Sequence, residues 1–169
     1  MPVKIDTFIE PNIITLQQAL EIALQHLQEG EFSKAERIYE RVIHVSPKQL
    51  QALHFLGTIA LHRGHNEKAV KFFKKAVTIE PELAEAHNNL GVAFKGLGLR
   101  TEAIKHYKKA VAINPRYAVA HNNIGVISQE AGQINEALDS CQKAVQLNPN
   151  YFEAHNNLGN VFQEAGRTE

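Results

Sequence analysis

The chain has 169 residues, 44% of them hydrophobic and 21% charged, a composition typical of a folded globular protein. Its 18 basic and 18 acidic side chains cancel, so no global charge argues for nucleic acid as a partner. Cys141 is the only cysteine, which excludes an intramolecular disulfide and a zinc site built on cysteine pairs.

The N-terminal segment, residues 1–15, has no helical period, and we expect an extended or mobile leader there. It lacks the continuous apolar core of a signal peptide, and no run of about 18 apolar residues follows that could insert into a membrane. With a single cysteine, these features predict a cytoplasmic protein. Thr15 followed by Gln18 predicts a capping box that opens the first helix.

The prolines show an internal repeat, because Pro47, Pro81, Pro115 and Pro149 are each 34 residues apart. Glycines, alanines and aromatic residues recur in the same phase. We therefore divide the chain into four repeats and the first helix of a fifth: residues 16–49, 50–83, 84–117, 118–151 and 152–169.

Residues 84–97 illustrate the first helix of a repeat, with one apolar face formed by Leu90, Ala93, Phe94 and Leu97. Gly98 then ends the helix, since glycine enters the left-handed conformation without steric cost. The same role is predicted for Gly30, Gly64, Gly132 and Gly166.

The second helix begins soon after this glycine and ends before Pro115, which has no amide hydrogen. Glu102 and Glu136 fall in the first turn of such helices, where acidic side chains are favoured. The small residues Gly91 and Ala103 are predicted near the crossing of the two helices, and Gly91→Leu should overpack it. Capping residues are expected at Ser33, Thr101 and Asn135.

The leucine-glycine, alanine, aromatic and proline positions of residues 84–117 resemble the tetratricopeptide repeat family, and the resemblance covers residues 16–169. Histidine or Leu53 replaces the large aromatic residue expected before the leucine, and Cys141 replaces a second aromatic residue. The resemblance implies an all-α, right-handed α-solenoid of stacked antiparallel helix pairs. First helices would line a concave groove and second helices a convex back.

The string His-Asn-Asn-Leu/Ile-Gly recurs at residues 87–91, 121–125 and 155–159. Its second asparagines should form a ladder with rungs about 10 Å apart, matching about every third residue of an extended peptide. The ladder resembles that in the repeat domain of O-linked N-acetylglucosamine transferase. Alternatively, these asparagines simply tie one repeat to the next. The predicted peptide-binding groove consists of Asn88, Asn89, Asn122, Asn123, Asn156, Asn157 and Asn160.

Other residues give little sign of chemistry. His87, His121 and His155 occur once per repeat, too far apart to bind one metal ion. His62 and His65 lack an obvious third ligand. Lys71, Lys74, Lys75, Lys105, Lys108 and Lys109 lie on second helices, as solvated side chains or as a surface for an acidic partner. Cys141 occupies a core position. No catalytic residue, metal or cofactor is predicted.

The sequence therefore predicts a scaffold that binds an extended peptide or a partner protein in the groove. Two alternatives stay open: a substrate-recognition arm of a larger glycosyltransferase-like enzyme with its catalytic domain beyond Glu169, and a scaffold that self-assembles end to end. The last helix, residues 152–165, lacks a partner helix. We expect Leu158, Val161, Phe162 and Ala165 to be bare and to drive self-association at high concentration.

Overall fold

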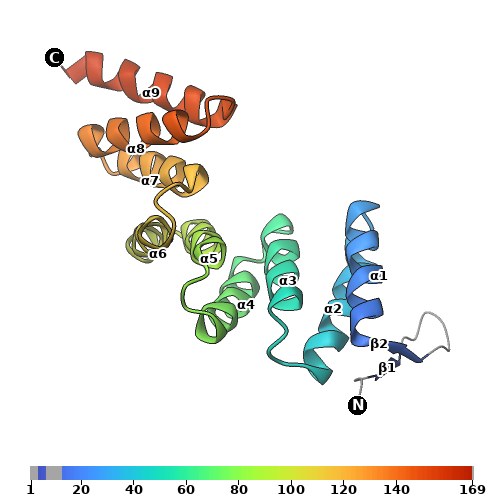
Figure 1. Cartoon of the computed structure of the whole chain (residues 1–169). Helices are drawn as coiled ribbons and strands as arrows, with labels where there is room; N and C mark the ends of the chain where they lie inside the picture. The colour runs from blue at the N-terminus through green and yellow to red at the C-terminus, as the bar shows by residue number, and fades with distance from the viewer. Residues whose placement is uncertain (1–3, 7–12, 169) are drawn as a thin grey trace. The chain divides into compact units, whose positions relative to one another are not determined.

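A computed structural model describes residues 4–6 and 13–168, which form two compact units divided after Pro81. Unit 1 contains strands β1 (Lys4–Asp6) and β2 (Ile13–Thr15) and four helices. These are α1 (Leu16–Gln28), α2 (Phe32–Val45), α3 (Leu50–His62) and α4 (Asn66–Ile79). Unit 2 contains α5 (Ala84–Gly96), α6 (Arg100–Ile113), α7 (Ala118–Glu130), α8 (Ile134–Leu147) and α9 (Phe152–Thr168). Consecutive helices pack as antiparallel pairs (Figure 1), which confirms the all-α helical repeat fold.

The leader contributes a feature that the sequence did not predict. β1 and β2 pair antiparallel, with Lys4 opposite Thr15 and Asp6 opposite Ile13, and they contact α1. The remainder of the expected leader, residues 1–3 and 7–12, lies outside the described residues. The capping box at the start of α1 is confirmed. Thr15 N–H donates to Oε1 of Gln18 at 2.9 Å, and Gln18 N–H donates to Oγ1 of Thr15 at 3.2 Å.

Glycine terminates the first helices of the four complete pairs, as predicted. Gly30, Gly64, Gly98 and Gly132 have φ between 71° and 77°, a region that costs glycine nothing. The reversal satisfies carbonyl groups of the last helical turn. His65 N–H, for example, donates to the Ala60 carbonyl at 2.8 Å, and Gly64 N–H donates to that of Leu61 at 2.9 Å.

Gly166 does not follow this rule, and the prediction that it ends the last helix is wrong. Its φ is not positive, and α9 continues through it to Thr168. Among the described residues, no second helix follows Gly166 whose packing would compensate for reversing the chain. The helix therefore keeps its own hydrogen-bond pattern.

The predicted caps of the second helices are also wrong. Glu31, Leu99 and Gln133 occupy the N-cap positions of α2, α6 and α8, and none makes a side-chain capping bond. Ser33, Thr101 and Asn135 lie one residue inside their helices, because the glycine reversal leads into the second helix earlier than a capping residue would. Glu102 and Glu136 are in the first turns, as expected.

The core lies between the helices of each pair, where small residues meet large ones. A Cβ built on Gly91 would lie 2.6 Å from Cδ1 of Tyr107 and 3.1 Å from the carbonyl oxygen of Ala103, which confirms the predicted close crossing. Gly57 lies against Phe73 in the same manner, and Gly125 against Cys141. Leu97 departs from the predicted buried face, because it is the C-cap of α5 and remains exposed.

Helix α9 buries a different face from the one that the sequence predicts. Val161 is fully buried, and together with Leu158 it packs against a cluster around Ala137 and Cys141 on α8. The apolar face that remains bare carries Phe152, which is 80% exposed, and Phe162, which is 52% exposed. Leu158, Val161 and Ala165 thus belong to the packed side of α9 rather than to its open side.

Candidate peptide-binding surface

The three asparagine strings lie on α5, α7 and α9, the first helices of successive pairs in unit 2. Hydrogen bonds join them diagonally. Asn123 Nδ2 donates to Oδ1 of Asn88 at 2.9 Å, and Asn157 Nδ2 donates to Oδ1 of Asn122 at 2.9 Å. Each of these second asparagines is therefore held by the first asparagine of the preceding repeat.

Burial separates the first asparagines from the second. Asn88 and Asn122 are 3% and 5% exposed, because the next first helix covers them. Asn89, Asn123 and Asn157 are half-buried. Asn156 and Asn160 on α9 are exposed. Asn88 and Asn122 therefore position their neighbours, and the partly accessible carboxamides are those of the second asparagines.

Two tyrosines lie near the row formed by the second asparagines, and the sequence did not predict them as part of the site. Tyr117 and Tyr151 precede α7 and α9 and are half-buried. Burial raises the pKa of Tyr117 to about 12, and the nearby Glu85 and Tyr151 add to the shift. Burial and the charge of Glu153 likewise raise the pKa of Tyr151, while a hydrogen bond with Asn122 opposes the rise. The available signal was a Pro-x-Tyr pattern one repeat apart.

This arrangement suits recognition of a peptide main chain. Nδ2 of Asn123 and of Asn157 is committed to the neighbouring repeat, which fixes the carboxamide and leaves its oxygen as an acceptor for a peptide N–H. The phenols of Tyr117 and Tyr151 are protonated at neutral pH, as tyrosines ordinarily are, and can donate to a peptide carbonyl. The surface therefore offers acceptor oxygens on α7 and α9 and phenolic donors on the residues just before these helices.

The three periodic histidines do not converge. His121 and His155 each place Nε2 beside a proline carbonyl of the preceding turn, Pro115 at 3.0 Å and Pro149 at 2.9 Å. His87 instead stacks on His106 of α6, with ring centroids 5.3 Å apart and Nδ1 atoms 3.1 Å apart. His87 is therefore engaged within its own repeat, whereas His121 and His155 contact the end of the repeat before theirs.

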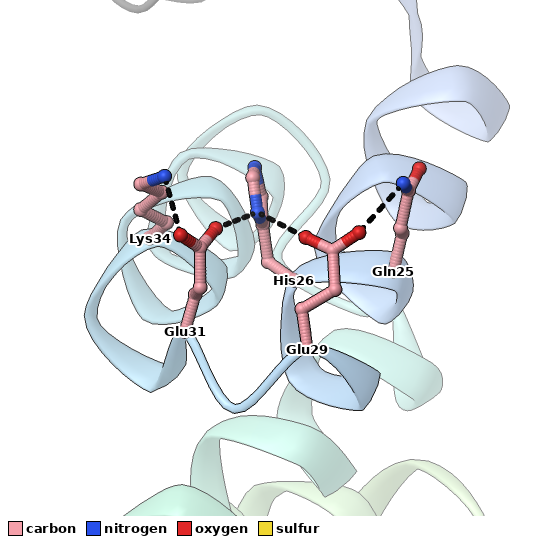
Figure 2. Close-up of polar contacts among 5 residues, drawn as sticks. All are labelled: Gln25, His26, Glu29, Glu31 and Lys34. Carbon is pink, nitrogen blue, oxygen red and sulfur yellow. Dashed lines mark hydrogen bonds and ion pairs between the residues drawn. The ribbon is translucent and has the colours of Figure 1, made fainter.

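A polar cluster at the α1–α2 connection was not predicted (Figure 2). Nδ1 of His26 lies 2.6 Å from Oε2 of Glu31 and 3.8 Å from Oε2 of Glu29. The three ligand-type atoms lie within 4.8 Å of one another, a spacing that a metal ion could bridge. Gly30 makes the cluster, since its left-handed backbone turns Glu31 back toward His26.

Both carboxylates of this cluster have further partners, however. Gln25 donates to Glu29 at 2.9 Å, and Lys34 donates to Glu31 at 2.7 Å. Hydrogen bonding from Lys34, followed by that from His26, holds the pKa of Glu31 below its usual range. We therefore interpret the cluster as a set of hydrogen bonds that ties the end of α1 to the start of α2.

The lysines of α6 are paired with acidic side chains. Lys108 contacts Glu136 at 2.8 Å, Lys109 contacts Glu82 at 2.9 Å, and Lys105 lies 4.0 Å from Glu102. Exposed pairs of this kind add little stability. They do offset the positive charge, so α6 offers a weaker surface for an acidic partner than its sequence indicates.

Cys141 is fully buried on α8, and burial raises the pKa of its thiol. A raised pKa lowers the fraction of reactive thiolate at neutral pH. We expect Cys141 to react with a thiol reagent such as Ellman's reagent only when unit 2 opens, so the labelling rate should rise steeply with denaturant. Labelling of the native protein at the rate of a free thiol would contradict this prediction.

Within the described residues, no helix combines the length and the apolar character needed to cross a membrane. The antiparallel helix pairs and the polar row on their first helices define a helical-repeat protein of the kind that forms protein-interaction scaffolds.

Comparison with known families identifies the type of repeat. A TPR repeat model matches residues 57–98 and 129–166, and tetratricopeptide repeat models match residues 84–117 and 106–139. These matches span residues 57–166 without a break. The chain belongs to the tetratricopeptide repeat family. No curated protein sequence matched the chain.

Solved structures with similar folds agree with this assignment. MamA is 25% identical, with 89% of this chain and 82% of that chain covered and a TM-score of 0.79. TTC0263, a thermophilic TPR protein of Thermus thermophilus, is 24% identical, with 90% and 84% covered and a TM-score of 0.75. YrrB, described as a TPR protein with an unusual peptide-binding site, is 19% identical, with 89% and 78% covered and a TM-score of 0.72. At these identities the last two show the fold alone.

Proposed function

We propose that unit 2 binds an extended segment of a partner protein along α5, α7 and α9, chiefly through the peptide main chain. The observation that carries this proposal is the fixed orientation of Asn123 and Asn157, whose Nδ2 atoms donate to Asn88 and Asn122 of the preceding repeats. A carboxamide held in place loses little side-chain entropy when a peptide binds. YrrB adds only that this fold accommodates a peptide-binding site.

Replacing Asn89, Asn123 and Asn157 together with alanine tests the proposal. A row of three rungs matches a peptide of about nine residues, so an array of random peptides of that length serves as the probe. Each lost hydrogen bond weakens binding by about 1 kcal/mol, and we expect the peptides retained by the native chain to bind at least about tenfold more weakly. Helicity, measured by circular dichroism, should be largely retained.

A matched control is the pair Asn88→Ala and Asn122→Ala, which removes the inter-repeat acceptors but keeps the second asparagines. This pair of changes should lower the melting temperature, because it removes the hydrogen bonds between repeats. It should weaken peptide binding less than the triple variant does, because the carboxamides that contact the peptide remain. The alternative, in which the asparagines only tie the repeats together, predicts instead that both sets of variants destabilise unit 2 and weaken peptide binding to the same extent.

The same surface would serve the substrate-recognition arm of an enzyme. A scaffold and a recognition arm would hold the peptide in the same way, and they differ in whether the bound protein is a partner or a substrate. End-to-end assembly would instead use the bare face of α9. That face carries Phe152 and Phe162 and is separate from Asn157.

A further inference from the structure

An open hollow of about 300 Å³ lies in unit 1, between the α2–α3 connection and the C-terminal half of α4. Its apolar lining comes from Pro47 and Ile79, and its polar lining from Lys74, Lys75 and Thr78. Both lysines are exposed. The Thr78 hydroxyl donates to the Lys74 carbonyl at 2.8 Å, so its proton is already used. The groups that can attract a ligand to this hollow are therefore positively charged.

The following repeat has a carboxylate at the same place. Lys109 stands 34 residues after Lys75, and Glu82 stands 34 residues after Lys48. Oε1 of Glu82 lies 2.9 Å from Nζ of Lys109, so this lysine has an acidic partner in its own unit. In unit 1 a positive charge, that of Lys48, takes the place of the carboxylate.

The backbone presents Lys48 in the same way as Glu82. The C-cap of α2, Ser46, has φ −130° and ψ 82°, and the C-cap of α4, Glu80, has φ −131° and ψ 91°. The next two residues of each connection form a turn. Within the described residues, neither Lys48 nor Lys75 has an ion pair. Two like charges therefore border the hollow without the carboxylate that the following repeat supplies.

Two features make α4 the most basic of these sites. Lys71 is exposed four residues before Lys75, so it lies on the same face of the helix and adds to the positive charge. In the fourth repeat Arg116 and Lys143 also stand at the two positions, but Gln142 precedes Lys143 where α4 has a second lysine. We therefore expect the strongest attraction for an anion at α4.

We propose that this hollow binds an acidic segment of a partner protein. A carboxylate of the segment takes, beside Lys75, the place that Glu82 takes beside Lys109. An adjacent apolar side chain packs on Pro47 and Ile79. The described lining residues include no aromatic ring on which a base could stack, which favours protein over single-stranded nucleic acid. The site lies in unit 1, so it does not depend on the asparagines of unit 2.

Fluorescence anisotropy with the intact chain and a labelled peptide of glutamate and leucine residues tests the proposal. The same peptide with glutamine in place of glutamate controls for charge, and an oligothymidylate of similar charge tests for nucleic acid. Exposed charge pairs are weak and are screened by salt, so binding is measured at low ionic strength. We expect the glutamate peptide to bind at least about tenfold more tightly than the glutamine peptide. Added salt should reduce this difference.

Lys48→Glu is the sharpest test, because it restores within unit 1 the ion pair that Glu82 makes with Lys109. It should weaken binding of the glutamate peptide at least about tenfold, since Lys75 gains a partner and the hollow gains a repelling carboxylate. The melting temperature should stay the same or rise. Arg37→Glu makes the same change of net charge at an exposed position about two turns before the end of α2. It should weaken binding at most about twofold.

Amide chemical shifts locate the bound peptide. We expect them to change at Lys48, Thr78 and Ile79 when the glutamate peptide is added. The alanine variant of Asn89, Asn123 and Asn157 should bind this peptide as well as the native chain does, which separates the two sites.

Equal binding of the two peptides, or equal losses from Lys48→Glu and Arg37→Glu, would overturn the proposal. Shift changes confined to unit 2 would do the same, because the peptide would then bind elsewhere. If the oligothymidylate bound more tightly than the glutamate peptide and lost affinity in Lys48→Glu, nucleic acid would be the occupant and the proposal would be wrong.

Discussion

Leucine in place of Gly91 is expected to disrupt the third helix pair, while leucine in place of Gly159 is expected to leave the chain at least as stable as before. The two glycines share one column of the repeat, yet their surroundings differ. A side chain at Gly91 meets the Tyr107 ring at 2.6 Å and the Ala103 carbonyl oxygen at 3.1 Å. The ring is 1% exposed and has no room to move, so the helices must separate.

Overpacking of a rigid core costs about 1–3 kcal/mol, and more when backbone must shift, so we expect Gly91→Leu to lower the free energy of unfolding by at least about 3 kcal/mol. At Gly159, leucine gains about 1 kcal/mol of helix propensity and meets nothing within 4 Å. Urea unfolding followed by circular dichroism measures both. Equal losses for the two variants would show that the column is sensitive for a reason other than the close crossing.

The features that the sequence predicted well are local or repeated. A glycine that adopts a positive φ, such as Gly98, recurs at the reversal within every complete helix pair, and the Thr15–Gln18 capping box depends on only four residues. The expected caps failed because hydrogen bonds of the glycine reversal determine where a second helix begins. Ser33 is a good cap by residue type, but it lies inside α2.

The candidate site was predictable in its residues but not in its contacts. The period places asparagines on α5, α7 and α9, but the bond from Asn123 to Asn88 joins residues of different repeats. Helical periodicity describes one helix at a time, so it does not show that Asn88 is covered by the next helix. The cluster around His26 escaped notice for a related reason: Glu31 approaches it only through the turn at Gly30.

A helix appended to α9 is expected to raise the stability of the C-terminal part of unit 2. Residues 158–169 align with residues 90–101, so a copy of residues 102–114 placed directly after Glu169 continues the repeat in register. It brings copies of Ala103, His106 and Tyr107 of α6 to the open face of α9. Gly166 would take the role of Gly98, which has φ 73°, and glycine adopts that conformation without strain.

Burying a phenylalanine that is half exposed contributes roughly 0.75–1.5 kcal/mol, half the value for full burial, and filling the open space at Gly159 adds to it. We expect a net gain on the order of 2 kcal/mol after the ordering of the new helix is included. Amide exchange at Val161 and Phe162 should slow by about tenfold or more, because α9 would open only with its new partner. A matched control is an appended copy in which the residues corresponding to His106 and Tyr107 are alanine. If that copy stabilises α9 equally, the gain comes from helix extension alone. If neither copy slows amide exchange at Val161 and Phe162, α9 is already as stable as its neighbours without a covering helix.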